Sequence, residues 1–170
     1  MRLPFFKRKV YPSKAEILSW NLMVAAIDPD QCWKMTGQFR GDIPSSVKTC
    51  EASFLMGSVV RNIIRESVPK DLQQSCITSA EAAYFKTFDD QSEDPLPDEM
   101  KKIYGSMTLG HVSRIALAAY GEEHDNLFLT SARLAQRVRT DPRDKPQIQQ
   151  EFQEKSDLLQ KYFQQGLRGT

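Results

Sequence analysis

The sequence predicts an all-α fold of five to seven helices in a single bundle-like domain, and three observations support this expectation. Apolar residues recur at spacings of three and four, which is the period of a half-buried helix. No stretch shows the sustained alternation of a strand. Prolines and short acidic stretches separate the periodic segments, as expected of connections between helices.

The first predicted helix begins at Ser13, because Ser13-Lys14-Ala15-Glu16 has the form of a capping box. Its apolar residues at helical spacing, which we expect to form the packing face, are Ile17, Trp20, Val24 and Ile27. We expect Asp28-Pro29-Asp30 to end this helix, since a residue before proline avoids the helical region. Residues 31–44 stay unassigned, because glycine and proline interrupt their large apolar side chains.

Five further helices are expected along the chain. The first of these, which begins at residue 44, has a wide apolar face typical of a central position. The predicted ranges are 44–68, 71–88, 98–120, 125–140 and 146–165. The segment 89–99 is acidic and contains proline, which predicts a linker. The expected organisation is therefore a basic-aromatic tip at 1–12 and one helical domain at 13–166 that contains this linker.

Two segments of the chain resemble each other weakly. Ser53–Arg61 can be laid over Ser106–Arg114 at an offset of 53 positions, with serine, glycine, valine and arginine coinciding. The match is compatible with two related helical hairpins. Chance similarity between amphipathic helices is the favoured interpretation, because the match is short.

Composition narrows the functional classes. The 23 basic and 22 acidic residues leave a net charge of +1, which gives no general field for binding nucleic acid. The three widely spaced cysteines fit neither a zinc motif nor a disulfide framework, and they indicate a reducing compartment. The N-terminus lacks the charge order of a signal peptide, and no apolar run is long enough for a transmembrane helix. We expect the cytoplasm, with the inner face of a membrane as an alternative.

One candidate ligand site lies on the predicted helix 98–120. Helical spacing places His111 on an apolar face with Tyr104, and Arg114 follows one turn later. A histidine there could bind a ligand or transfer a proton. The alternative is a core histidine that hydrogen-bonds to the backbone. The Glu122-Glu123-His124-Asp125 cluster suits a solvated connection better than a metal site, so neither a metal nor a cofactor is expected.

Basic residues supply two further candidate contacts. The N-terminal tip combines aromatic and basic side chains that suit a membrane surface or a partner: Phe5, Phe6, Lys7, Arg8 and Lys9. The alternative is a frayed end whose rings cover an edge of the core. Two arginine stripes could bind phosphates or an acidic partner segment, and otherwise form solvated faces: Arg61 with Arg65, and Arg133 with Arg137.

The sequence contains no recognisable catalytic set. The leading hypothesis is therefore a non-enzymatic cytoplasmic interaction or regulatory protein that recognises a protein partner, or itself, through helical faces. One alternative is a small-ligand-binding protein or enzyme with a polar pocket around His111 and Arg114. The other is a peripheral membrane protein attached through residues 1–9.

Overall fold

The computed structural model describes residues 12–37, 39–89, 96–121 and 127–169, with the backbone alone for 127–131. All regular elements in these ranges are helical, which confirms the all-α prediction. The described elements are α1 (Lys14–Ala26), α2 (Pro29–Thr36), α3 (Ser45–Ser67), α4 (Lys70–Thr87), α5 (Asp98–Tyr104), α6 (Leu109–Gly121), α7 (Leu127–Arg137), a 3₁₀ turn (Pro142–Asp144) and α8 (Lys145–Arg168). The described chain thus has eight α-helices, and the expectation of five to seven was wrong.

One additional helix, α2, lies in the segment that stayed unassigned. The Asp28 carboxylate accepts hydrogen bonds from the backbone N–H groups of Asp30 (2.8 Å) and Gln31 (3.3 Å), which caps the helix. Pro29 occupies the first turn, where its missing N–H would have no partner within the helix. The proline that was expected only to end the first helix therefore also begins the second.

The other additional helix arises because the predicted helix 98–120 is broken. Gly105 has a φ of 70°, which ends α5, and α6 begins only at Leu109. The Thr108 hydroxyl accepts a hydrogen bond from the His111 N–H (3.2 Å) at the start of α6. Ser106–Thr108 therefore lie outside any helix, whereas the similar stretch at residue 53 lies inside α3. The predicted helix 98–120 contained the second of these stretches, and the expectation that this helix is continuous was wrong.

Helix α3 is the centre of the fold. It contacts α1, α2, α4, α6, α7 and α8, and residues 51–60 are all buried. At Gly57 a β-carbon would lie 2.7 Å from the ring of Tyr84, so the absence of a side chain lets α3 and α4 approach closely. The Tyr84 hydroxyl donates a hydrogen bond to the Ser113 carbonyl of α6 (2.7 Å). This one ring therefore joins three helices.

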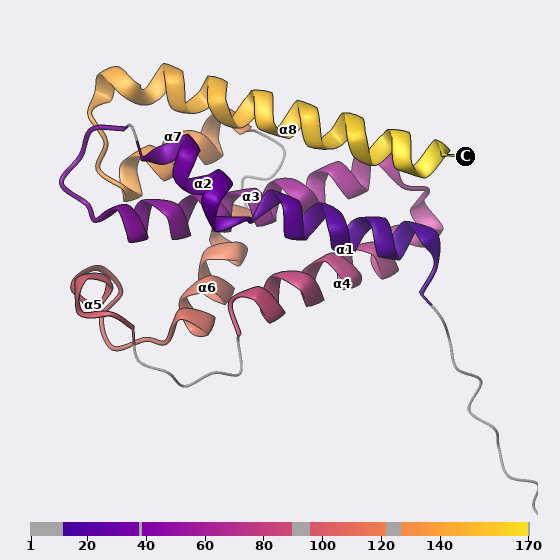
Figure 1. The fold of residues 1–170 in the computed structure, drawn as a ribbon, viewed down its shortest axis with the longest axis horizontal. Helices are drawn as coiled ribbons and strands as arrows, with labels where there is room; N and C mark the ends of the chain where they lie inside the picture. The colour runs from indigo at the N-terminus through magenta and orange to yellow at the C-terminus, as the bar shows by residue number, and fades with distance from the viewer. Residues whose placement is uncertain (1–11, 38, 90–95, 122–126, 170) are drawn as a thin grey trace, which may run out of the picture.

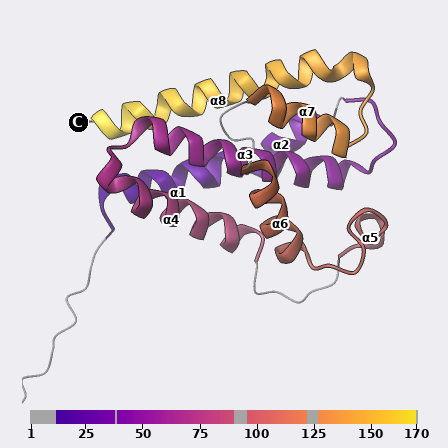
Figure 2. The same ribbon diagram turned by 180° about the vertical axis from the view of Figure 1, so that it is seen from behind.

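The outer helices lie on different sides of α3. Helix α1 passes in front of α3 in Figure 1, and α6 lies in front of it in Figure 2, so the two helices cover opposite faces. Helix α8 runs along one edge. At its C-terminal end the Lys14 ammonium donates to the Gly169 carbonyl (2.8 Å), and a β-carbon at Gly166 would lie 3.1 Å from the Leu18 side chain. Gly166 thus serves the close packing of α8 on α1.

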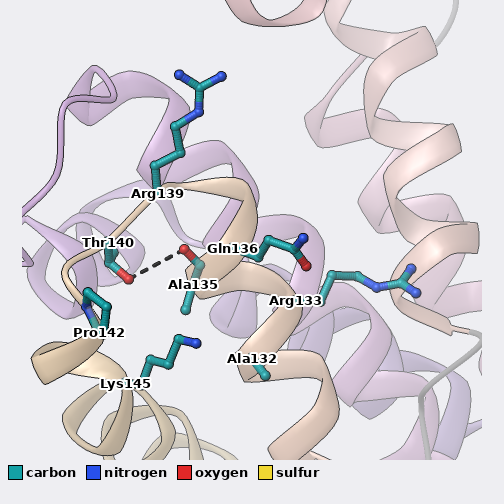
Figure 3. A pocket seen from close by; sticks show the side chains of 8 residues that line it. All are labelled: Ala132, Arg133, Ala135, Gln136, Arg139, Thr140, Pro142 and Lys145. Atoms are coloured by element: carbon teal, nitrogen blue, oxygen red, sulfur yellow. Dashed lines mark hydrogen bonds between the residues drawn. The ribbon is translucent and has the colours of Figure 1, made fainter.

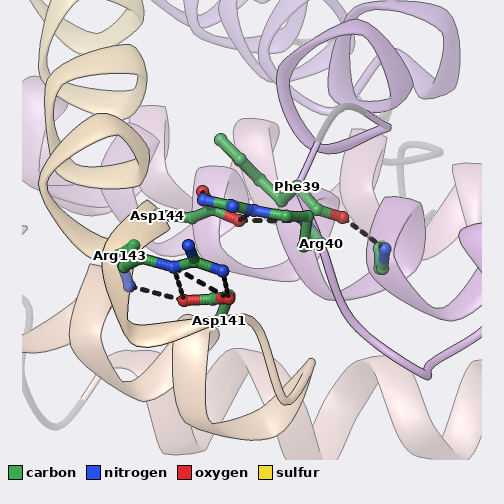
Figure 4. Close-up of polar contacts among 6 residues, drawn as sticks. Phe39, Arg40, Asp141, Arg143 and Asp144 are labelled. Carbon is green, nitrogen blue, oxygen red and sulfur yellow. Dashed lines mark hydrogen bonds and ion pairs between the residues drawn. The ribbon is translucent and has the colours of Figure 1, made fainter.

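A polar clamp joins the α2–α3 connection to the turn before α8 (Figure 4). The Arg40 guanidinium binds the Asp144 carboxylate at 2.6 Å, and its hydrogen bonds hold the pKa of Asp144 below its ordinary value. Arg143 binds Asp141 at 2.7 Å and lowers the pKa of that carboxyl in the same way. The clamp therefore fixes the backbone at the junction of α7 and α8.

Candidate functional site

Helix α1 is apolar on both of its sides. Its inner side places Leu22, Met23 and Ala26 in the core. Its outer side exposes Ile17 and Val24, whose side chains are 49% and 47% accessible. The sequence assigned these two residues to the packing face, and the structure shows that this assignment was wrong. A helix that is hydrophobic all round is ordinarily buried all round.

The outer side of α1 forms an uncharged surface, which we call the α1 face: Ile17, Trp20 and Val24. No residue from Ile17 to Ala26 carries a charge. Trp20 is half-buried beside α4, where the Lys86 ammonium lies 5.7 Å from the centre of its ring. The Ser79 hydroxyl of α4 donates to the Glu16 carbonyl (2.8 Å). These contacts hold α1 in place and leave the two aliphatic side chains in solvent.

A buried carboxylate joins four helices. Glu51 lies on α3 and is only 1% exposed. The Arg137 guanidinium donates two hydrogen bonds to it, at 2.7 and 2.9 Å. Tyr104 donates to one carboxylate oxygen (3.0 Å) and Tyr120 to the other (2.6 Å). One side chain therefore connects α3 to α5, α6 and α7.

This Glu51 network is saturated. Each oxygen of Glu51 accepts two hydrogen bonds, which uses the four sites that a carboxylate offers. Burial and the nearby charge of Glu51 raise the pKa values of Tyr104 and Tyr120. Both hydroxyls therefore remain protonated donors at neutral pH. The arrangement suits structural cross-linking better than acid–base catalysis, because no acceptor site remains for a substrate.

The three residues of the predicted ligand site are not brought together as expected. His111 and Arg114 are exposed on α6, and Tyr104 is buried against Glu51. The break at Gly105 is the physical reason, since it removes the helical register that placed Tyr104 and His111 on one face. Arg114 lies over the ring of Phe85 at 4.5 Å. The expectation that His111 lies on one apolar face with Tyr104 was wrong, and so was the alternative of a core histidine, because His111 is exposed.

The predicted arginine stripes divide among separate partners. Arg61 binds Glu81 of α4 at 2.7 Å, and Arg65 is exposed. Arg133 donates to the Ala119 carbonyl at 2.5 Å, and Arg137 binds Glu51. The N-terminal residues Phe5 to Lys9 lie outside the described residues, as does the cluster at 122–125. Their predicted contacts therefore stay predictions.

The three cysteines are free thiols. Burial raises the pKa of Cys32 to about 11 and that of Cys50 to about 12, so both are protonated at neutral pH. Within the described residues, no group of three metal-ligating side chains is close enough to hold an ion. Among the described helices, none combines the length and the apolar character needed to span a membrane.

Comparison with known proteins adds no relative. No protein-family model, curated protein or solved structure matches this chain.

Proposed function

We propose that this chain is a non-enzymatic interaction or regulatory protein of the cytoplasm that recognises an apolar helix of a partner protein through the α1 face. The observation that carries the proposal is the exposure of Ile17 and Val24 on a helix that has no charged residue between Ile17 and Ala26. The free thiols support a reducing compartment. One continuous apolar core supports the bundle-like single domain that we expect for residues 13–166.

The spacing of the α1 face suits a helical partner. Ile17, Trp20 and Val24 follow one another at three and four residues, which is the spacing of anchors in helix-in-groove recognition. Each aliphatic side chain is about half exposed, so its burial by a partner would contribute about 1 kcal/mol. Trp20, which lies between them, is one of the residue types enriched among binding hot spots.

Self-association through the same face is included in this proposal. A second copy would bring an identical uncharged helix against the first, as two-fold symmetric dimers do. The pocket expected around His111 has less support, because His111 is exposed and lines neither of the described pockets. Attachment to a membrane through residues 1–9 stays a prediction.

The experiment compares two charge-introducing variants. Ile17→Lys/Val24→Lys places charges on the α1 face, and Leu158→Lys places one at a residue of equal exposure, 47%, on α8. Cross-linked capture from lysate of the native cells and sedimentation of the purified protein are measured for the wild type and both variants. A stoichiometric partner, or a dimer, that is lost only in the α1 variant supports the proposal.

Two results would contradict the proposal that the α1 face binds a partner or a second copy. The first is a partner or dimer that the α1 variant retains. The second is a wild-type protein that captures no partner and sediments as a monomer. Circular dichroism establishes that both variants keep the helical content of the wild type before the comparison is made.

A further inference from the structure

A cationic pocket lies at the junction of α7 and α8, where α8 begins with Lys145 and no residue of α1 takes part. Its volume is about 560 Å³, and it opens to solvent. Three of the side chains that line it are basic: Arg133, Arg139 and Lys145. None of the described residues that line it is acidic. We call it the α7–α8 pocket.

The carboxylates of the neighbouring turn do not neutralise this pocket. Asp141 binds Arg143 at 2.7 Å, and Asp144 binds Arg40 at 2.6 Å (Figure 4). Within the part of the chain that the structure describes, neither Arg139 nor Lys145 forms an ion pair. The carboxylates of the polar clamp are therefore paired with Arg40 and Arg143, and they do not pair with Arg139 or Lys145.

The backbone of Arg139 supplies an independent observation. Helix α7 ends in a Schellman motif, in which the Thr140 N–H bonds to the Ala135 carbonyl (3.1 Å) and the Arg139 N–H to the Gln136 carbonyl (3.2 Å). Arg139 occupies the left-handed position of this motif with a φ of 48°, where glycine is the usual residue. Strain of this kind is often retained at ligand-binding positions. At this position the chain has a cationic residue, although a glycine would be less strained.

We propose that the α7–α8 pocket binds a small anion of the phosphate class that carries several negative charges. Proteins bind phosphate groups with arginine, which offers a planar fork of N–H donors, and with lysine, which acts as a point charge. The volume lies within the range of about 300–1,000 Å³ found for small-molecule sites. Small side chains, Ala132 and Ala135, line the wall and leave room for an uncharged part of the ligand.

Figure 3 shows how the basic groups are arranged around this space. The Lys145 side chain extends toward Ala132 and Ala135. Arg133 extends toward α6, where it contacts the Ala119 carbonyl, and Arg139 extends away from Lys145. Binding therefore requires the Arg139 guanidinium to swing back over the mouth of the pocket. This site is separate from the α1 face, so the two proposals can fail independently.

The test uses sodium tripolyphosphate as the probe. Isothermal titration calorimetry at low salt measures its affinity for the full chain, with sodium chloride of equal ionic strength in the reference titration. Arg139→Gly and Lys145→Ala should each weaken binding about tenfold, which corresponds to a charge-assisted hydrogen bond. Lys161→Ala removes an exposed cation on α8 away from the pocket and should leave the affinity within twofold of the wild type.

The arginine variant has a second readout that separates binding from folding. Arg139→Gly should raise the melting temperature, because glycine relieves the left-handed strain, while it lowers the affinity. Opposite signs support the proposal. If the melting temperature falls with the affinity, Lys145→Ala alone decides whether the pocket binds the probe.

The phosphate groups could belong to a soluble molecule or to a lipid headgroup, and a second arm distinguishes these sources. Flotation with phosphatidylcholine vesicles that contain phosphatidylinositol bisphosphate is compared with vesicles of phosphatidylcholine alone. Binding of either phosphate probe that Lys145→Ala weakens about tenfold supports the site and identifies the source of the phosphate groups. Binding of neither probe, or binding that Lys161→Ala weakens as much as the pocket variants, overturns the proposal.

Discussion

Replacing Arg137 with methionine tests the Glu51 network most sharply. The substitution keeps an apolar stem on α7 and leaves the Glu51 carboxylate, which is 1% exposed, with the two tyrosine hydroxyls as its only described donors. Removing one partner of a buried ion pair ordinarily costs about 3–5 kcal/mol. The Arg137 side chain is 44% exposed, so solvent screening reduces the expected loss to about 2–3 kcal/mol.

The same reasoning predicts a rescue. Glu51→Gln in the Arg137→Met background removes the buried charge that the first substitution left uncompensated, so it should recover at least half of the lost free energy of unfolding. Urea unfolding followed by circular dichroism measures all four members of this cycle. The expected loss corresponds to a fall of roughly 5–10 °C in the melting temperature of Arg137→Met.

Arg143→Met is the matched control, because it removes an arginine that is 73% exposed and bonded only within its own turn. It should change the free energy of unfolding by less than about 1 kcal/mol. If Arg137→Met destabilises the protein no more than this control does, or if Glu51→Gln adds to the loss instead of reducing it, the account of the network is refuted.

Three further predictions follow from the core. Burial raises the pKa values of Tyr84, Tyr104 and Tyr120, so the folded chain keeps protons that the unfolded chain loses near pH 10. The free energy of unfolding should therefore be unaffected by these tyrosines below pH 10 and should fall above it, by up to about 1.4 kcal/mol per pH unit for each of them. Urea unfolding at pH 9 and at pH 11 measures this fall. Gly57→Ala should destabilise the protein by about 1–3 kcal/mol, because its β-carbon would lie 2.7 Å from the Tyr84 ring; a thermal unfolding curve that matches the wild type would remove the close approach of α3 and α4 from the account. The raised pKa values of Cys32 and Cys50, about 11 and 12, predict that a thiol reagent labels both slowly at neutral pH until urea is added, and rapid native labelling would contradict these pKa values.

Local signals predicted much of the fold. The Ser13 hydroxyl accepts a hydrogen bond from the Glu16 N–H (3.3 Å), as the capping pattern indicates. Pro44 and Pro97 stand directly before α3 and α5, close to the predicted helix starts. These features depend on neighbouring residues alone. The break at Gly105 was missed because a single glycine within an otherwise helical pattern does not reveal its φ angle.

The candidate sites depend on contacts between distant residues, which periodicity does not reveal. The partners of Glu51 lie 53, 69 and 86 positions away in the chain. The available signal was one acidic residue at the start of a long apolar stretch. In α1 the apolar residues surround the helix, so their spacing alone could not decide which side packs on the core and which side is exposed.

Photo-cross-linking from the α1 face is the most direct test of recognition through this helix. A photo-reactive amino acid replaces Val24 in one protein and Leu158 in another, since both side chains are 47% exposed. We expect that irradiation in native cells joins the protein at position 24 to one partner, or to a second copy, and gives no such product at position 158. Cross-links that are equal at the two positions, or absent at position 24, would contradict recognition through α1.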